Sequence, residues 1–186
     1  VQDLIPMTPG NRQARPFRPE PKVPRPGRRG PASTRSPTRF AASVLETLAR
    51  RGLAGPGDVV LAAVSAGPDS TALVAALAEL RDAGHLAAVH ALHVDHGLRP
   101  GGADDAACAA TACARLGVAF RSVRVRVGPG NVQAAARRAR YRALADEADR
   151  VGATRIATGH TRTDQAETVL MRLLRGSGAR GLSAIP

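Results

Sequence analysis

Short apolar runs alternate with stretches of helical period along most of this chain, and no other feature of the sequence constrains the fold as strongly. Residues 58–64 contain the unbroken run Val-Val-Leu-Ala-Ala-Val, which is typical of a strand buried on both faces. The same patterns predict further strands at 86–94, 119–127 and 155–158, and helices at 43–51, 70–83, 103–116, 132–151 and 163–174. Strands that alternate with helices imply an α/β fold, in which helices cover both faces of a parallel sheet.

Composition limits what this fold can be built from and where it can reside. The 186 residues suffice for about one domain, and its core must consist of Ala, Val and Leu because only four residues are aromatic. No run approaches a membrane span of about 18 apolar residues, and the N-terminus lacks a charged stretch followed by a hydrophobic one. We therefore expect a cytoplasmic protein without a membrane partner.

The two cysteines, Cys108 and Cys113, lie five residues apart in a segment of helical period. This spacing matches no metal or redox motif and places the two residues on different faces of a helix. We expect two inert thiols, buried or half-buried.

Positive charge is concentrated at the N-terminal end of a chain whose formal net charge is +12. Residues 1–40 hold nine Lys or Arg against two acidic residues, together with nine of the fourteen prolines, and they show no apolar period. Such a segment cannot bury enough surface to order itself, so we expect disorder at 1–39 and a folded domain at 40–186. A basic tail can add salt-sensitive affinity for nucleic acid, and a solvated extension without a ligand is the alternative.

Polar residues follow three of the predicted strands, at 65–70, 95–99 and 159–164. Ligands of parallel sheets bind at this carboxyl edge. The first turn joins a strand to a helix N-terminus, where backbone amides and hydroxyls favour an anion. It lacks the Lys-Ser/Thr of a Walker A loop and the three glycines of a dinucleotide fingerprint. Phosphate binding and simple helix capping are equal alternatives for its six residues, which are Ser65, Ala66, Gly67, Pro68, Asp69 and Ser70.

The Ser-x-Gly-x-Asp-Ser pattern of this turn resembles the pyrophosphate-binding loop of the PP-loop, or N-type, ATP pyrophosphatases, which have a Rossmann-like sheet. The later motifs are His-Val-Asp-His-Gly-Leu-Arg at 93–99, Ala-Arg-Arg-Ala-Arg-Tyr at 136–141, Gly-His with Asp-Gln-Ala-Glu-Thr at 159–170, and Leu-Arg-Gly-Ser-Gly at 174–178. In order and spacing they resemble the catalytic domain of the tRNA(Ile)-lysidine synthetase family, over about residues 58–186. Related tRNA thiolases generally carry paired cysteines, and the absence of a CxxC motif argues against them.

The resemblance implies a ligase that uses ATP and Mg²⁺. The wobble cytidine of the CAU anticodon of tRNA(Ile) is adenylated with release of pyrophosphate, and free lysine then displaces AMP. The six loop residues would bind the phosphates of ATP, and Asp69 would also bind the metal. The implied catalytic residues are Asp69, Asp95, His96, Arg99, His160, Asp164 and Glu167, and the implied substrate-binding residues are Arg137, Arg140 and Gln165.

Several of these residues also have plain structural interpretations. Asp164 and Glu167 would hold the α-amino group of lysine or accept its proton, but they also suit the first turn of a helix. Arg137 and Arg140, three residues apart, would share a helical side and meet phosphate or tRNA, or else form a solvated face. His93 and His96 make a weak metal pair, since no third ligand lies nearby in the sequence.

Two positions depart from the family pattern. Ala66 stands where the family has Gly. This would weaken binding if the site needed a positive φ or a very close backbone approach there, and the alternative is that the extra methyl group is tolerated. Thr163 stands where the family often has Asp, and a Thr can replace Asp as a helix N-cap. The family continues beyond residue 186, so a truncated nucleotide-binding module without ligase activity is an alternative, as is another PP-loop enzyme. The oligomeric state stays open, a homodimer included.

Overall fold

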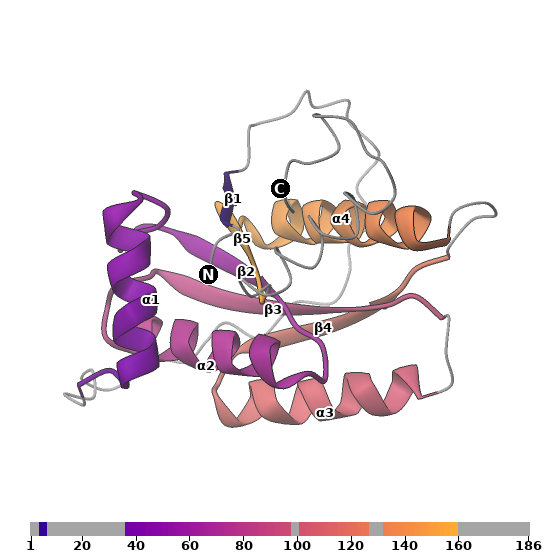
Figure 1. Cartoon of the computed structure of the whole chain (residues 1–186), viewed down its shortest axis with the longest axis horizontal. Helices are drawn as coiled ribbons and strands as arrows, with labels where there is room; N and C mark the ends of the chain where they lie inside the picture. The colour runs from indigo at the N-terminus through magenta and orange to yellow at the C-terminus, as the bar shows by residue number, and fades with distance from the viewer. Residues whose placement is uncertain (1–3, 7–35, 98–100, 127–131, 160–186) are drawn as a thin grey trace, which may run out of the picture.

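The computed structural model describes residues 4–6, 36–97, 101–126 and 132–159, which form a sheet flanked by helices (Figure 1). No helix within these ranges combines the length and apolarity needed to cross a membrane. The strands are β1 (Leu4–Pro6), β2 (Val59–Ala63), β3 (Ala88–Asp95), β4 (Ala119–Arg124) and β5 (Arg155–Thr158). The helices are α1 (Arg39–Arg50), α2 (Pro68–Asp82), α3 (Gly102–Arg115) and α4 (Val132–Val151).

The sheet has the order β1-β5-β2-β3-β4, and its four strands from β5 to β4 are parallel. From β2 the chain moves outward through β3 to β4, and α4 then returns it to β5 on the other side of β2. This reversal creates a switch point at the carboxyl end of β2, where ligands of such sheets bind. The predicted α/β architecture with a parallel sheet is confirmed.

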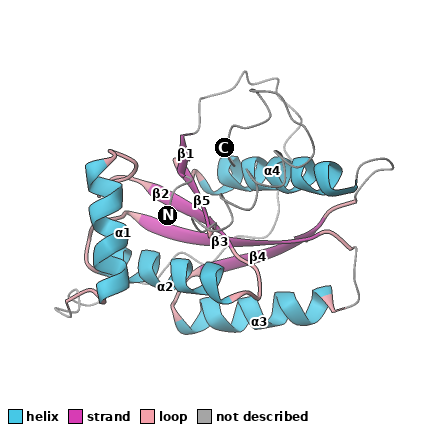
Figure 2. Cartoon of the chain, in the orientation of Figure 1, coloured by secondary structure: helices cyan, strands magenta, loops and turns pink. Residues whose placement is uncertain are grey.

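Helices cover both faces of the sheet, as the sequence predicts. Figure 2 shows α2 and α3 on one face and α4 on the other. Val89 and Ala91 of β3 belong to the core shared with α1, α2 and α3, whereas Leu92 of β3 packs with Leu144 of α4. A central strand therefore needs apolar side chains at successive positions, because each face meets a helix layer.

The element boundaries differ from the predicted ones by a few residues. α1 begins four residues earlier than predicted, because Thr38 caps it by accepting a hydrogen bond from Ala41 N at 3.3 Å. Thr38 N in turn donates to Glu79 Oε2 of α2 at 2.8 Å, which links the two helices. α2 begins at Pro68, since proline suits the first helical turn where no amide donor is needed.

The short strand β1 lies within the segment for which we expect disorder. Its three residues pair antiparallel with β5, Leu4 opposite Ala157 and Pro6 opposite Arg155. The expectation of disorder for residues 1–39 stays a prediction. No sequence pattern predicts β1. The helix expected at 163–174 lies outside the described residues.

The two cysteines occupy different faces of α3, as predicted. Cys113 is buried, and this burial raises the pKa of its thiol. Cys108 is exposed, so the expectation that both thiols are at least half-buried is wrong for this one. A small exposed side chain on the outer face of α3 has no neighbouring element to cover it.

A buried carboxylate ties α4 to the edge strand β4. Glu147 has a side chain only 5% exposed and accepts hydrogen bonds from Arg121 Nη1 at 2.9 Å and from Arg150 Nη2 at 2.6 Å. Burial alone would raise the pKa of Glu147, but the hydrogen bonds and charges of the two arginines outweigh it and lower this pKa.

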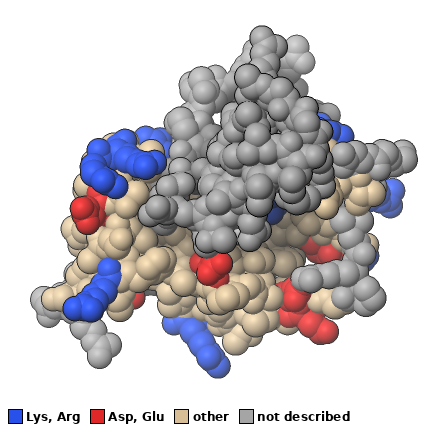
Figure 3. Space-filling view, in the orientation of Figure 1, with Lys and Arg blue, Asp and Glu red and all other residues tan. Residues whose placement is uncertain are grey.

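Charge is nearly balanced over the part of the chain that the structure describes. These residues hold 14 Arg against 11 Asp or Glu, and Figure 3 shows both signs interspersed over one face. The large positive excess of the whole chain therefore comes mainly from residues outside the described ranges.

Candidate functional site

A cavity of about 530 Å³ opens at the carboxyl ends of β2, β3 and β5. The turn after β2, the first residues of α2 and α3, and one arginine of α4 form its wall. This is the switch point of the sheet, so the place where the sequence predicts a ligand site is hollow in the structure. The polar and glycine residues that line it are Ser65, Gly67, Asp69, Ser70, His93, Asp95, His96, Gly102, Asp105, Arg140, Thr158 and Gly159.

The turn between β2 and α2 is held together by the hydroxyl of Ser70. This oxygen accepts a hydrogen bond from Ser65 N at 3.0 Å and lies 3.0 Å from the carbonyl oxygens of Ser65 and Gly67, to which it donates. Ser70 is 8% exposed, whereas Ser65 is exposed. Ser70 therefore shapes the turn from inside, and Ser65 presents its hydroxyl to the cavity.

Helix capping, the structural interpretation of this turn, does not describe what the side chains do. The N-cap of α2 is Gly67, and no side chain makes a capping hydrogen bond there. Asp69 is exposed in the first helical turn, and Gly67, Asp69 and Ser70 all line the cavity. An uncapped helix start that faces a cavity is suited to an anion, because its first amides lack intrahelical partners.

Ala66 does not strain the turn. Among the described residues every positive φ belongs to glycine, so the backbone at Ala66 is one that any residue adopts. The first of the two conditions for weaker binding, a positive φ at this position, is therefore not met.

Gly159, immediately after β5, is a site residue that sequence reasoning missed. A Cβ atom built at this position would lie 2.9 Å from Ser70 Cα and 3.1 Å from Ser70 N. Only glycine lets the end of β5 approach the turn after β2 this closely. A glycine directly after a buried strand is the signal that could have identified it.

Asp95 lies in the cavity wall, but neighbouring groups engage its carboxylate. Oδ1 accepts a hydrogen bond from Gly97 N at 2.8 Å, and Oδ2 lies 3.6 Å from Arg124 Nε. A Cβ atom at Gly102, the first residue of α3, would lie 2.7 Å from Oδ1. The carboxylate is thus packed between the turn after β3 and the start of α3.

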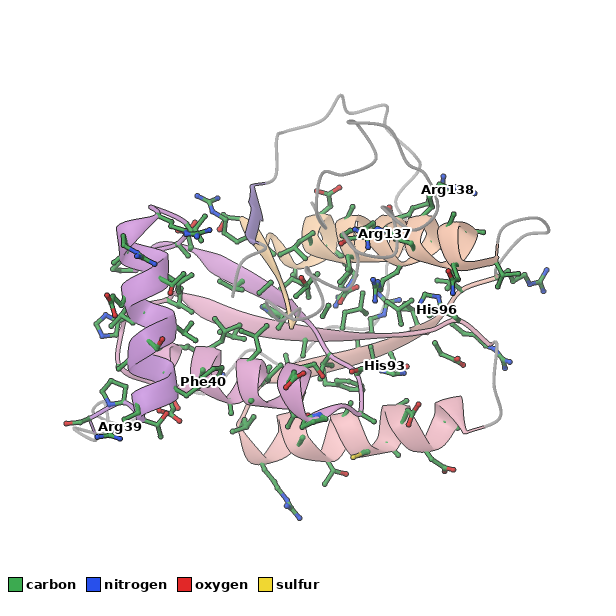
Figure 4. The ribbon with its side chains drawn as sticks, in the orientation of Figure 1. Arg39, Phe40, His93, His96, Arg137 and Arg138 are labelled. Atoms are coloured by element: carbon green, nitrogen blue, oxygen red, sulfur yellow. The ribbon has the colours of Figure 1, made fainter. Side chains whose placement is uncertain are left out.

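His93 of β3 and His96, which directly follows β3, point to opposite sides of the sheet, as Figure 4 shows. His93 is buried, and its Nδ1 lies 3.0 Å from Val64 O. His96 faces α4, and its Nδ1 is buried with no hydrogen-bond partner among the residues that the structure describes. The same residues contain no group of three potential metal ligands, so nothing there favours a histidine metal site.

Arg140 reaches the cavity from α4, while Arg137 stays beside it. The guanidinium carbons of Arg137 and Arg140 lie 5.2 and 5.7 Å from the centroid of the Tyr141 ring. The two arginines therefore share one side of the helix, as predicted, and only Arg140 lines the cavity. Burial lowers the pKa of Arg140, yet an arginine stays protonated at neutral pH.

Comparison with known proteins identifies the family of this cavity. Residues 38–186 match the family described as PP-loop domain, which is more than three quarters of the chain. The chain belongs to the PP-loop domain family. The turn that holds Ser65 and Ser70 follows the central strand β2 and lines the cavity within this matched region.

Two curated relatives of this PP-loop chain are both named tRNA(Ile)-lysidine synthase. The one from Symbiobacterium thermophilum is 48% identical over 149 residues, which are 77% of this chain and 31% of the relative. The one from Pseudomonas syringae pv. tomato is 50% identical over 124 residues, which are 66% of this chain and 27% of the relative. The chain therefore spans about a third of the length of the curated relatives it matches.

A solved structure shares the PP-loop fold at low sequence identity. It is a U34-tRNA thiolase from Methanococcus maripaludis, with a TM-score of 0.60, 17% identity, and coverage of 76% of this chain and 52% of that one. This likeness confirms the fold expected for a PP-loop ATP pyrophosphatase.

Five predicted site residues of the PP-loop chain lie outside the described residues and stay predictions. Arg99 follows β3. The other four belong to the last motif and are His160, Asp164, Gln165 and Glu167. The structure brings Asp69, Asp95, His96 and Arg140 to one cavity, and it adds Gly102, Asp105, Thr158 and Gly159, which sequence reasoning did not assign to the site.

Proposed function

We propose that this chain uses ATP to ligate lysine to the wobble cytidine of the CAU anticodon of tRNA(Ile). The observation that carries the proposal is the PP-loop cavity at the switch point, in a chain about 48% identical to relatives named for this activity. The cavity supplies an uncapped helix start on one side and a cation on the other, which is the pairing that a triphosphate needs.

The residues of the cavity suit the two ends of a polyphosphate. Ser65 offers a hydroxyl, and Asp69 and Ser70 offer backbone amides in the first turn of α2, where Pro68 has none. Arg140, on the facing wall, supplies a guanidinium that can pair with phosphate oxygens in a bidentate manner. Preorganised donors of this kind stabilise the charge that develops as pyrophosphate leaves.

Asp69 fits a magnesium site of the kind that binds nucleotides. Its carboxylate is exposed at the cavity rim and makes no capping bond. Magnesium is commonly bound by one or two carboxylates together with substrate phosphates, so a single Asp beside the phosphate site is enough. Bound there, the metal would neutralise part of the charge on the leaving pyrophosphate.

The reaction has two displacements that share this cavity. In the first, the C2 oxygen of cytidine forms a bond to the α-phosphorus of ATP, and the bond to the bridging oxygen breaks, so that pyrophosphate leaves with the electron pair. In the second, the ε-nitrogen of lysine forms a bond to C2, the C2–O bond breaks, and AMP leaves with the electron pair. The nitrogen is an ammonium in free lysine and must lose a proton before it can attack.

A nucleotide-binding module without ligase activity is the second candidate. The observation that favours it is the cavity itself, whose uncapped helix start, serine hydroxyl and arginine are groups that bind a nucleotide. Such a module would bind ATP in the same cavity without any turnover that depends on tRNA.

The test is an assay with ATP, Mg²⁺, labelled lysine and a tRNA(Ile) transcript with a CAU anticodon. We expect labelled lysine on the tRNA with release of AMP and pyrophosphate, and no label on a transcript whose wobble cytidine is replaced by uridine. Binding of ATP without tRNA-dependent AMP release would favour the module instead.

A variant of the loop tests whether this cavity performs the reaction. Asp69→Asn should lower Mg²⁺-dependent pyrophosphate release by about 100-fold, the scale on which single groups that stabilise charge act, and leave the thermal melt unchanged. Asp104→Asn is the matched control, because Asp104 occupies the first turn of α3, is exposed, and does not line the cavity. Unchanged release by Asp69→Asn would remove the loop from the mechanism.

A further inference from the structure

One buried nitrogen in the cavity wall has no hydrogen-bond partner among the residues that the structure describes. His96 Nδ1 is shielded from solvent, and no described residue forms a hydrogen bond with it. Buried polar atoms are nearly always paired, because an unpaired one loses its bonds to water without a replacement. Since His96 lines the cavity, its ring places a nitrogen without a described partner beside the ligand site.

The groups around His96 keep its imidazole neutral. Burial is the main cause that lowers the pKa of His96, and the charges of Arg140 and His93 lower it further, while Asp95 raises it. Asp69 and Asp105 are the other acidic side chains in the cavity wall. A neutral imidazole has one nitrogen that accepts a hydrogen bond or a proton, which a protonated one lacks.

The backbone that carries His96 is held on three sides. The carboxylate of Asp95 accepts from Gly97 N at 2.8 Å, which closes the turn around His96. Asp95 O accepts from Val125 N at 2.8 Å, which attaches the same point to the chain after β4. Because Gly102 leaves no room for a Cβ beside this carboxylate, the start of α3 also fixes its position.

We propose that His96 accepts the proton that the attacking amine must lose, and that Asp95 is the positioning residue that orients it. In this step one N–H bond of the lysine ε-ammonium breaks, its electron pair stays on the nitrogen, and the proton forms an N–H bond on the imidazole. The nitrogen becomes a nucleophile, and the negative charge of Asp95 favours the imidazolium that results. The inference rests on the proposed ligation of lysine and names the group that prepares its second displacement.

A two-step assay of His96→Gln tests the role. Positioned proton acceptors contribute about 100-fold or more to a rate, so we expect lysine transfer to fall at least that far while pyrophosphate release from ATP and tRNA stays within about twofold. The control is His85→Gln, since His85 follows α2 and does not line the cavity. Equal loss in both steps, or no loss in either, overturns the inference.

The outcomes separate this inference from the proposed function. If the unaltered chain transfers lysine and the His96→Gln variant transfers it at the same rate, the inference is overturned and the proposed function stands. Absence of lysine transfer from the unaltered chain overturns the proposed function and the inference with it.

A titration of the free chain gives a second readout that needs no turnover. Nuclear magnetic resonance should find the pKa of His96 below the ordinary histidine value of about 6.5. Asp95→Asn should lower it further and move the acidic limb of the transfer rate to lower pH, which a purely structural role would not do. A His96 that titrates at or above the ordinary value overturns the inference whatever the chain ligates.

Discussion

At the scale of single residues, the contact between Gly159 and Ser70 sets the width of the cavity. Gly159→Ala would force a methyl group to within 2.9 Å of Ser70 Cα, so either β5 or the turn after β2 must shift. Overpacking of this kind costs about 1 to 3 kcal/mol. We expect nucleotide affinity, measured by isothermal titration calorimetry, to fall at least tenfold while the circular dichroism spectrum stays that of the folded chain.

Gly57→Ala is the control for this substitution. Gly57 precedes β2, and a Cβ atom there would have no neighbour within 4 Å. Its nucleotide affinity should match that of the unaltered chain. If Gly159→Ala bound nucleotide equally well, the close approach of β5 to the turn would not matter for the site.

Residue types and their order along the chain were enough to predict which turns form the site, but not what each side chain does in it. Asp95 was expected to act on the substrate, yet its carboxylate is engaged by Gly97 and Arg124. That engagement depends on a strand 29 residues away in the sequence, which no local pattern reveals. The unpaired nitrogen of His96 is likewise visible only once α4 has packed over β3.

At the scale of elements, Glu147 determines how firmly α4 and β4 are joined. Its pKa is lowered in the folded chain, so its contribution to stability is present above the unfolded value of about 4.3 and is lost as the pH falls through the folded value. Glu147→Gln should lower the free energy of unfolding by about 2 kcal/mol at pH 7. This is less than the loss of a fully buried ion pair would cost, because both arginine side chains are about 40% exposed to solvent. Urea unfolding at pH 7, 5 and 3.5 measures the difference in free energy of unfolding between the variant and the unaltered chain. This difference should be smallest at pH 3.5.

Asp149→Asn provides the comparison, because Asp149 is an exposed carboxylate two residues further along α4. Its free energy of unfolding should change by less than about 0.5 kcal/mol at any of these pH values. A Glu147→Gln variant as stable as the unaltered chain would show that the two arginines are equally well solvated without the carboxylate.

The helices and parallel strands were predictable from their apolar residues. These residues recur at helical spacing in the helices and form short unbroken runs in the buried strands. β4 shows the limit, since nothing in its sequence predicts that Arg121 pairs with Glu147, 26 residues away. β1 shows another, because three residues are too few to carry a period and their pairing depends on β5 being in place.

At the scale of the whole molecule, the basic excess consists almost entirely of arginine, since Lys22 is the one lysine in the sequence. Arginine pairs with phosphate in a bidentate manner, which suits a polyanionic substrate. Four of the five arginines of α4 lie before residue 143, and its three acidic residues follow it. The N-terminal half of this helix is therefore basic, and its Arg140 lines the cavity. Figure 4 shows Arg138 on the outer side of α4.

If tRNA lies along this basic half, its affinity must depend on salt through the counterions that each phosphate contact releases. The logarithm of the association constant should fall linearly with the logarithm of salt concentration. Arg138→Gln and Arg142→Gln, both at exposed positions, should each make that slope shallower by about one unit. Fluorescence anisotropy with labelled tRNA between about 50 and 200 mM salt measures it.

The control for these variants is Arg115→Gln, an exposed arginine at the end of α3 on the other face of the sheet. It removes the same charge from the molecule, so an effect of net charge alone would appear in all three variants equally. A shallower slope for Arg138→Gln and Arg142→Gln, but not for Arg115→Gln, means that phosphates contact this half of α4. Equal slopes throughout would mean that tRNA approaches the cavity by another surface, and the basic half of α4 would then be a solvated face.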